Sequence, residues 1–523
     1  MGNPGLTRRQ LLRGTAGLGL GAFVASCGGG NSGGGGAGTP STSPSISRSP
    51  VAPNWDSLRM GLKGALYRPE DSGYNGARLL FNRQFDAVSN PDAIAAVANE
   101  QDVATCVRFA RDSALPLRIR AGGHSYLGAS TGSGLVIDLR AIHGVVVDNG
   151  LATIGAGAQL VDVYGSLAPQ GVLIPAGSCP SVGVAGLMLG GGMGVVGRKF
   201  GLTCDRLESA RVVLADGRVV TASAHSEPDL YWALRGGGGN FGIVTSLTVR
   251  TYPAQALSLF SWNWPWDDAA NVFAGWQQWM PSTPNELWST CHVLATVAGS
   301  GPTASVSGVY VGDVPAMQNL LSGLRDAVGR PPSRTFAKRE APLTAMLIEA
   351  GCGSTSQQAC HVGDFGAGSL TRDAFVAASD YFSSPIPGAS IDAAVSAVEG
   401  RQNDPALGVG GVAFDSWGGA VNVPSPGDTA FVHRRSMFAA QYTASWQDQP
   451  GNTARAANEA SLRAIQATLH SAANGEAYQN YADPTLADPL TAYYGTNLSR
   501  LRAVKKTYDP DNVFNQPQGI SPA

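Results

Sequence analysis

The stretch at residues 177–194 reads Gly-Ser-Cys-Pro-Ser-Val-Gly-Val-Ala-Gly-Leu-Met-Leu-Gly-Gly-Gly-Met-Gly. Its many glycines lack a Cβ, so the backbone can lie directly against a ligand, and its lack of charge favours an uncharged, flat one. A second stretch, Arg118-Ile-Arg-Ala-Gly-Gly-His-Ser-Tyr126, follows a predicted strand. Its consecutive glycines let backbone N–H groups approach a diphosphate. Together the two segments predict a cofactor site built largely from backbone.

One alternative for the glycine-rich stretch is a nicotinamide-dinucleotide site. Residues 192–197, Gly-Met-Gly-Val-Val-Gly, match the G-x-G-x-x-G fingerprint. That fingerprint needs a helix after the glycines and an acid about 20 residues further on. Arg198-Lys-Phe-Gly201 would end such a helix early, and Asp205 and Glu208 come too soon. The sequence therefore disfavours this interpretation.

Composition limits the class of protein. The chain has 523 residues and a net charge of −2, so a general nucleic-acid binder, which would be basic, is not expected. Only 14% of residues are charged and 43% are hydrophobic, which excludes wholesale disorder. Outside the N-terminal segment, no apolar run reaches the roughly 18 residues of a membrane-spanning helix. The bulk of the chain is expected to be globular.

The N-terminus has the pattern of an export signal. Arg8 and Arg9 precede a short apolar stretch at residues 14–25, as in a twin-arginine signal peptide. The stretch ends Val-Ala-Ser-Cys27, which resembles a bacterial lipobox, although a plain cleaved signal with an incidental cysteine is the alternative. Residues 28–53 are mostly Gly, Ser, Thr and Pro and read as a flexible tether. We expect an exported, extracytoplasmic protein that contacts the membrane only through a lipid anchor.

The seven cysteines include no C-x-x-C pair, so no metal site is expected. Cys352 and Cys360 enclose a short loop, and an oxidising compartment would allow a disulfide there. Cys106, Cys204 and Cys291 are interpreted as buried structural residues.

Hydrophobic periodicity and turn signals predict an α+β organisation. Two short helices are expected within residues 91–113, with Asp92 and Asp102 as caps. The expected strands lie at 115–120, 135–139, 145–147 and 243–250, and residues 212–220 read as a hairpin turning on Asp216-Gly217. From about residue 256 the chain becomes rich in tryptophan, at Trp262, Trp264, Trp266, Trp276 and Trp279. These rings could stack on sugars, but hydrophobic core is the favoured reading.

Over roughly residues 75 to 520, the chain resembles the berberine-bridge-enzyme-like branch of FAD-linked oxidases. The resemblance rests on the Gly-Gly-His124 loop, on Cys179-Pro-Ser-Val-Gly with Arg198-Lys-Phe-Gly-Leu, and on Tyr478-Gln-Asn-Tyr-Ala-Asp, Tyr493-Tyr-Gly-Thr-Asn-Leu-Ser-Arg-Leu and Tyr508-Asp-Pro-Asp-Asn-Val-Phe. It implies a two-part FAD-binding domain of the PCMH type and a substrate domain with an antiparallel sheet flanked by helices. The expected divisions are a signal at 1–27, a linker at 28–53, the FAD-binding domain at 75–253, the substrate domain at 254–470 and a C-terminal segment at 471–523 that returns to the FAD site.

The same resemblance assigns the cofactor and its ligands. His124 matches the histidine bonded to the flavin 8α-methyl carbon, and Cys179 matches the cysteine bonded to flavin C6 in members with two links. The expected FAD-binding residues are Arg120, Ala121, Gly122, Gly123, His124, Ser125, Cys179, Val182, Gly183, Gly186, Gly190, Gly191, Gly192, Gly194, Gly242, Ile243, Val244 and Asn480.

The resemblance also implies how the reaction would proceed. Tyr478 matches the Tyr-x-Asn tyrosine often assigned as the general base, Tyr126 matches an active-site aromatic, and Gln441 is a candidate for polar substrate contact. A tyrosine pKa is ordinarily near 10, so a nearby cation or the flavin must favour the phenolate. For Tyr481 and Tyr494, core packing is at least an equal alternative.

The expected function is oxidation of a sugar, oligosaccharide or other alcohol, with the flavin reoxidised by O₂. Val182 matches a position that leaves room for oxygen beside the flavin, which favours an oxidase. A dehydrogenase with another acceptor, or an oxidative-cyclisation enzyme of secondary metabolism, remains the alternative. A surface lipoprotein that only binds a ligand is a third, disfavoured because His124, Cys179 and Tyr478 are all present. We expect a monomer whose partners are a small-molecule substrate and O₂, and no nucleic acid.

Overall fold

The computed structural model describes residues 52–297, 299–366, 368–446 and 452–523. The predicted signal at 1–27, and nearly all of the predicted linker at 28–53, lie outside these residues. Within them, none of the helices combines the length and the apolar character needed to cross a membrane.

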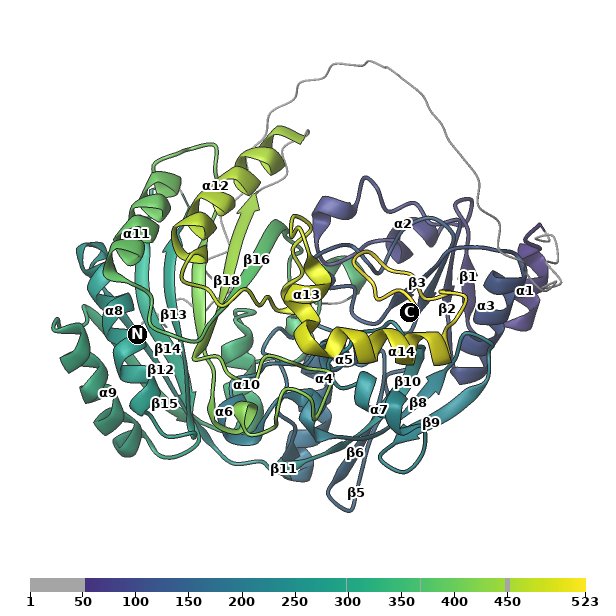
Figure 1. The fold of residues 1–523 in the computed structure, drawn as a ribbon, viewed down its shortest axis with the longest axis horizontal. Helices are drawn as coiled ribbons and strands as arrows, with labels where there is room; N and C mark the ends of the chain where they lie inside the picture. Colours follow the sequence, from purple (N-terminus) through teal and green to yellow (C-terminus); the bar gives the residue numbers. More distant parts are fainter. Residues whose placement is uncertain (1–51, 298, 367, 447–451) are drawn as a thin grey trace.

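The first half of the chain contains two main sheets, on the right in Figure 1. A four-stranded sheet has the order β1 (Ala65–Tyr67), β2 (Ala93–Ala96), β4 (Leu135–Asp138), β3 (Leu117–Arg120), with β2 and β3 both parallel to β4. A five-stranded antiparallel sheet has the order β5 (Val145–Asp148), β6 (Leu151–Gly155), β10 (Ile243–Arg250), β8 (Leu207–Val213), β9 (Val219–Ser223). A small sheet pairs β7 (Val172–Leu173) with β11 (Tyr252–Pro253).

Most of the sequence-based predictions for this half are confirmed. The strands expected at 115–120, 135–139, 145–147 and 243–250 are β3, β4, β5 and β10, and the hairpin of β8 and β9 turns at Gly217, whose φ is 80°. The α-helices of this half are α1 (Trp55–Gly61), α2 (Tyr74–Ala77), α3 (Glu100–Asp112), α4 (Leu160–Leu167), α5 (Val184–Leu189), α6 (Gly197–Phe200) and α7 (Pro228–Ala233); α10 (Pro342–Ala350) comes later in the chain. Helix α6 has only four residues, as expected from the Arg198–Gly201 segment that argued against a dinucleotide fingerprint.

Of the two helices predicted within residues 91–113, the first is wrong and the second is confirmed. The first segment is the buried strand β2, and the second is α3, which is capped by Asn99 rather than Asp102. The Asp102 carboxylate instead accepts hydrogen bonds from the backbone N–H groups of Lys63, Gly64 and Ala98. Because β2 is paired on both edges and buried, tertiary contacts outweigh the strong intrinsic helix preference of its alanines.

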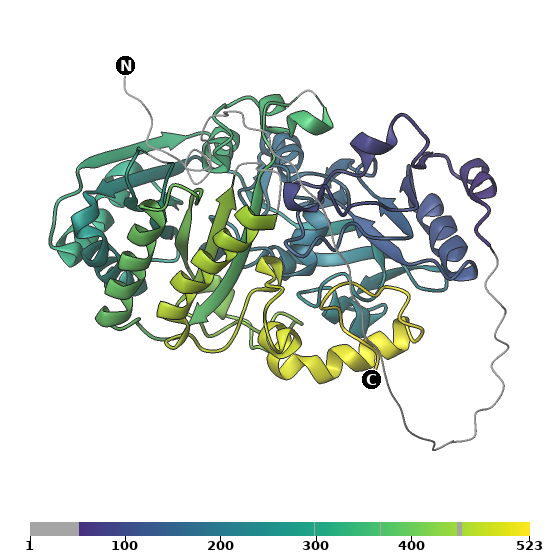
Figure 2. The ribbon, with the colours of Figure 1, turned by 90° about the horizontal axis from the view of Figure 1, so that it is seen from above.

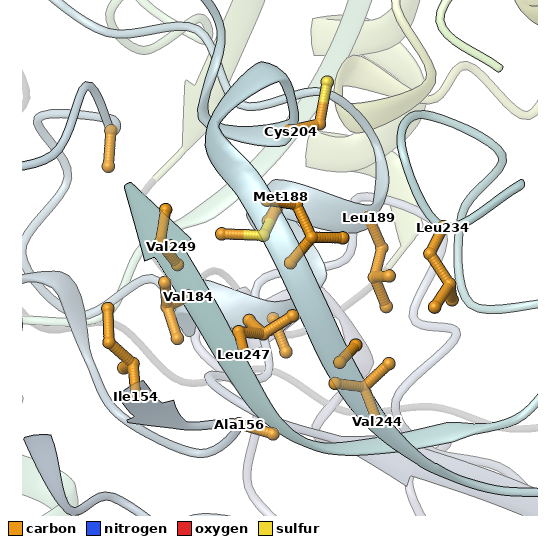
Figure 3. Close-up of a cluster of buried hydrophobic side chains, with 14 of the residues drawn as sticks. Ile154, Ala156, Val184, Met188, Leu189, Cys204, Leu234, Val244, Leu247 and Val249 are labelled. Atoms are coloured by element: carbon orange, nitrogen blue, oxygen red, sulfur yellow. The ribbon is translucent and has the colours of Figure 1, made fainter. Parts of the chain in front are cut away.

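Helix α5 packs against strand β10 in the largest hydrophobic core. Val184 and Met188 of α5 lie over Leu247 and Val249 of β10, with Cys204 at the edge of the cluster (Figure 3). Cys106, Cys204 and Cys291 are all fully buried, which confirms their reading as structural residues. This core fixes the glycine-rich segment that surrounds α5.

The second half is built on a seven-stranded antiparallel sheet. Its order is β15 (Arg334–Glu340), β12 (Leu257–Trp264), β14 (Thr303–Tyr310), β13 (Leu287–Ala295), β17 (Gly410–Ser416), β18 (Phe438–Trp446), β16 (Ala374–Phe382). One face is covered by α8 (Ala269–Trp279), α9 (Val314–Val328), α11 (Gly388–Gln402) and α12 (Asn452–His470), on the left in Figure 1. Trp264, Trp276 and Trp279 are buried in the core between sheet and helices, so the core reading of these tryptophans is confirmed.

The C-terminal segment leaves this second half and returns to the first (Figures 1 and 2). It contains α13 (Pro489–Tyr494) and α14 (Leu498–Tyr508). The buried Lys505 ammonium binds the Asp509 carboxylate at 2.6 Å and donates to the carbonyl oxygens of Asn240 and Phe514, at 2.7 and 2.9 Å. A buried charge needs such a complete set of partners, and this one fastens the C-terminal motif beside the glycine loop that contains Asn240.

Candidate active site

Two glycine loops meet backbone to backbone at the centre of the molecule. A Cβ on Gly122 would lie 2.1 Å from the nitrogen of Gly183, and a Cβ on Gly183 would lie 2.2 Å from the nitrogen of Gly122. Neither position has room for a side chain, which is the physical reason for glycine in both loops. The contact brings His124 of the first loop and Cys179 of the second to one cavity.

The cavity has a volume of about 320 Å³, and none of the described residues that line it is an Asp, Glu, Lys or Arg. Most of the predicted site residues line it: Ala121, Gly122, Gly123, His124, Ser125, Tyr126, Cys179, Val182, Gly183, Gly186, Gly190, Gly194, Gly242, Ile243, Val244, Tyr478 and Asn480. The two loops, the start of β10 and the C-terminal segment all contribute to it.

Four predicted residues, Arg120, Gly191, Gly192 and Gln441, lie outside this lining. Arg120 is fully buried, lies 3.6 Å from Asp138 and donates to the carbonyl oxygens of Ala77 and Ser130. Burial lowers its pKa to about 10. Its contacts indicate that it supports the first loop from behind rather than lining the cavity. A Cβ on Gly191 would lie 2.7 Å from the Phe431 ring, so this glycine also supports the wall from behind.

The His124 ring is held on an edge and on a face. Its Nε2 lies 2.9 Å from the Oγ of Ser181, a buried residue of the second loop. The ring of Phe81 stacks on it, with centroids 4.1 Å apart and planes 17° apart. Cys179 is exposed at the cavity.

The hydroxyl of Tyr478 is surrounded by hydrogen-bond donors. It accepts from the backbone N–H of Gly192 at 3.0 Å, from that of Met193 at 3.3 Å, and from the Asn480 side-chain amide at 2.9 Å. A neutral phenol oxygen has two lone pairs, so three donors match a phenolate better. Burial nevertheless raises the pKa of Tyr478 to about 12, against the lowering effect of these donors. The donors are neutral amides, whereas we expected a nearby cation or the flavin to favour the phenolate.

Tyr126 connects the two halves of the molecule. Its hydroxyl accepts a hydrogen bond of 2.7 Å from the Gln441 amide, which comes from β18 of the seven-stranded sheet. Its ring stacks on Tyr481 at 5.8 Å and meets the edge of Phe375 at 5.1 Å. Gln441 therefore reaches the site through Tyr126.

The residues around the cavity fit FAD. At Gly186 and Gly239, both in the lining, an added Cβ would enter open space, so the bare backbone can lie along a flat ligand. Because the described lining residues include no Lys or Arg, backbone N–H groups would be the donors for a diphosphate. His124 and Cys179 would hold the isoalloxazine end.

Several residues at the site were not singled out from the sequence. Ser181 lies within the Cys179-Pro-Ser-Val-Gly motif, which could have drawn attention to it, and Gln516 and Gln518 follow directly on the Tyr508–Phe514 motif. Trp288 also lines the cavity, and so do Tyr493 of the predicted C-terminal motif and Tyr481 and Tyr494, for which core packing was the equal alternative.

Family models and known proteins are similar to this chain. The model described as FAD binding domain matches residues 91–223, and the model described as Berberine and berberine like matches residues 477–521. The uncharacterized FAD-linked oxidoreductase YgaK of Bacillus subtilis (strain 168) is 34% identical over 469 residues, which cover 88% of this chain and 97% of that protein. The chitooligosaccharide oxidase of Gibberella zeae is 30% identical over 453 residues, covering 83% of this chain and 87% of that oxidase.

A solved structure agrees with the fold. The glucooligosaccharide oxidase from Acremonium strictum, described as containing 6-S-cysteinyl, 8α-N1-histidyl FAD, superposes with a TM-score of 0.78 at 25% identity. The match covers 90% of this chain and 99% of that one. The chain is an FAD-linked oxidoreductase that is related to carbohydrate oxidases. With its two glycine loops, its antiparallel sheet and its returning C-terminal segment, it belongs to the berberine-bridge-enzyme-like family.

Proposed function

We propose that the protein is an oxidase with covalently bound FAD, which oxidises a neutral alcohol, most simply a sugar or oligosaccharide, to a carbonyl compound. In the overall reaction the substrate loses two hydrogens and O₂ gains them as H₂O₂. One observation carries the proposal: a single uncharged cavity brings together His124, Cys179 and Tyr478 from three separate segments.

Both tethers are supported by the position of His124 and Cys179 in the cavity lining. Each link replaces one hydrogen of the flavin and one of the side chain, and O₂ accepts the two electrons and two protons. The acid-precipitated protein is expected to stay yellow after washing, and His124→Ala and Cys179→Ala are each expected to retain one link. Complete loss of colour from Cys179→Ala alone would contradict an independent histidyl bond.

The bound flavin would accept a hydride from the substrate carbon at its N5 atom and pass two electrons to O₂. The protein then has to remove the proton of the substrate hydroxyl, and Tyr478 is assigned to this step as the general base. The Gly192, Met193 and Asn480 donors stabilise negative charge on the Tyr478 oxygen. Burial excludes water from that oxygen, so these donors act in a medium of low dielectric constant.

The substrate is proposed to be an uncharged polyhydroxy compound. The Gln441–Tyr126 pair provides hydrogen-bonding groups between the two halves, as a polyhydroxy substrate requires. The relatedness to a chitooligosaccharide oxidase supports a carbohydrate.

The test is a screen of mono- and oligosaccharides and phenolic alcohols for anaerobic bleaching of the flavin absorbance, followed by admission of air. Bleaching by a carbohydrate and return of the colour with formation of H₂O₂ is the expected result. Bleaching without return in air would assign the protein to the dehydrogenase or oxidative-cyclisation alternative, and no bleaching by any alcohol would contradict the substrate class. Tyr478→Phe with a full flavin content is the matched control, and it should bleach far more slowly.

We further propose that the protein works outside the cytoplasm on a lipid anchor, as a monomer. The Arg8-Arg9 pair, Cys27 and the following tether support this location, and the Cys352–Cys360 disulfide fits an oxidising compartment. Residues 75–253, 254–470 and 471–523 would form the FAD-binding, substrate and returning parts. Cells that express wild type or Cys27→Ala are to be fractionated; equal partition into the aqueous phase contradicts the anchor.

A further inference from the structure

We propose that Ser181 is a positioning residue for flavin attachment, whose hydroxyl fixes the orientation of the His124 ring so that Nδ1 forms the bond with the flavin. The inference rests on the proposed covalent flavin and adds the residue that selects the attaching nitrogen.

The backbone around Ser181 is held in place by hydrogen bonds. The backbone N–H of Val182 donates to the Cys179 carbonyl at 3.3 Å, so Ser181 lies inside a tight turn that begins at the other link residue. The Pro180 carbonyl accepts from Val161 at 3.0 Å, and the Val182 carbonyl accepts from Leu160 at 3.0 Å, which fastens the turn to α4. Ser181 is only 2% exposed.

The two loops also have a fixed distance from each other. A Cβ on Gly122 would lie 2.8 Å from the Ser181 carbonyl oxygen and 2.1 Å from the Gly183 nitrogen. The backbone of the His124 loop therefore packs directly on the backbone of the Ser181 turn. The 2.9 Å contact between Ser181 Oγ and His124 Nε2 depends on this packing rather than on two long, flexible side chains.

Phe81 and Ser181 constrain different motions of the His124 ring. Stacking on Phe81 fixes the plane of the ring but permits a 180° rotation about χ2, which leaves the plane unchanged and exchanges nitrogen and carbon positions. Only in one of these two orientations does Nε2 face the Ser181 hydroxyl. The hydrogen bond thus selects the orientation.

The same contact selects the tautomer. To form the bond, Nδ1 needs a lone pair, so the ring proton must be on Nε2, where it is donated to Ser181 Oγ. When the Nδ1–carbon bond forms, the methyl group loses one hydrogen and Nε2 loses its proton. The two electrons and two protons are taken by O₂ as H₂O₂. A hydroxyl can then donate to the Nε2 lone pair, so a serine fits both the initial and the linked state.

The experiment compares wild type with Ser181→Ala, Ser181→Thr and Ser181→Val. After proteolysis, mass spectrometry measures the histidyl-linked and cysteinyl-linked flavin peptides separately, and NMR of the isolated histidyl flavin identifies the attached nitrogen. Ser181→Ala is expected to lower the Nδ1-linked fraction about tenfold or more, or to divide it between Nδ1 and Nε2, while the cysteinyl link persists. Ser181→Thr should restore the Nδ1 link. Ser178→Ala, a hydroxyl removed from the same loop, is the matched control.

The side chains of Thr and Val have nearly the same shape and differ in the hydroxyl. If the alanine variant does not fold, comparing Ser181→Thr with Ser181→Val still tests whether the hydroxyl directs the Nδ1 link. Full Nδ1 linkage in Ser181→Ala, or equal linkage in the Thr and Val variants, overturns the role of Ser181 and leaves the covalent flavin intact. A wild-type protein without a histidyl flavin overturns both proposals.

Discussion

Phe81, which stacks on His124, is also part of a small hydrophobic core that contains the Cys352–Cys360 disulfide. The other members of that core are Val161, Leu347, Val362 and Leu370. The Phe81 backbone N–H donates to the Gly123 carbonyl at 3.2 Å, directly beside His124 in the chain. The two cysteines are only 8 residues apart in the sequence, and they share this core with the ring that stacks on His124.

We expect the double variant Cys352→Ser, Cys360→Ser to be less stable than wild type. Cross-linking a loop of this length lowers the entropy of the unfolded chain enough to contribute about 2 to 3 kcal/mol to the free energy of unfolding. Denaturant unfolding of the two proteins measures the difference. A reductant should lower the stability of wild type and leave the double variant unchanged; an equal response of both would contradict a stabilising disulfide.

Tyr478→Phe is expected to fold with normal flavin content and to lose about 10²–10⁴-fold in the rate of flavin reduction, the usual contribution of a general base. Because burial raises the pKa of Tyr478 to about 12, the phenolate is a minority below that pH and its share grows as the pH rises. The reductive rate of wild type should therefore increase with pH between about 7 and 10, and the increase should vanish in Tyr478→Phe. Tyr481→Phe, in the adjacent ring, is the control that should keep the pH dependence. A Tyr478→Phe rate within about threefold of wild type removes Tyr478 from the mechanism.

Asn480→Ala removes one of the three donors on the Tyr478 oxygen. A hydrogen bond to a charged group contributes about 1.5–3 kcal/mol, so the reductive rate at a fixed pH should fall about tenfold to a hundredfold. Asn480→Asp replaces the donor by an acceptor with a negative charge and should be slower still. Stopped-flow reduction with saturating substrate measures both; a faster aspartate variant is the outcome that contradicts stabilisation of a phenolate.

Features set by neighbouring residues in the sequence could be predicted, whereas features that depend on contacts between distant segments could not. The β8–β9 hairpin was predictable because Asp216-Gly217 specifies a local turn, and the glycine loops because their motifs are contiguous. The strand β2 was not, because its alanines become a strand only through pairing with β1 and β4. The Gln441–Tyr126 bond joins residues 315 positions apart. The main-chain donors on Tyr478 carry no side-chain signature, so the sequence predicted that a nearby cation or the flavin would favour the phenolate instead.

His470 should make stability depend on pH. Its Nδ1 lies 2.9 Å from the buried carboxylate of Asp380, and this hydrogen bond raises the pKa of His470 above its ordinary 6.5. A pKa raised by folding stabilises the protein fully below the unfolded value, and the contribution disappears as the pH rises through the folded value. The difference in stability between wild type and His470→Gln should therefore be largest below about pH 6.5 and shrink at higher pH. Since the side chain is 58% exposed, the effect should be modest. Thermal unfolding of wild type and His470→Gln from pH 5 to 9 measures this difference, and His225→Gln, at an exposed histidine, is the control. A stability difference that grows with pH would contradict a pKa raised by folding.

The last prediction concerns oxygen. Val182 lines the cavity three residues after Cys179, and its backbone closes the turn that holds Cys179 and Ser181. Its carbonyl accepts from Leu160, another lining residue, so the backbone cannot easily retreat from a larger side chain. Val182→Leu adds one methylene to a closely packed wall, and overpacking of this kind costs about 1–3 kcal/mol. We expect reoxidation of the reduced flavin by O₂ to slow roughly tenfold, equivalent to about 1.4 kcal/mol of added barrier, while flavin reduction is spared. Val182→Ala should reoxidise at least as fast as wild type. Stopped-flow measurement of the two half-reactions separates the effects. Equal reoxidation rates in wild type and Val182→Leu would show that the side chain at position 182 does not control access of oxygen. A wild-type reduced flavin that survives for minutes in air-saturated buffer would contradict the oxidase assignment itself.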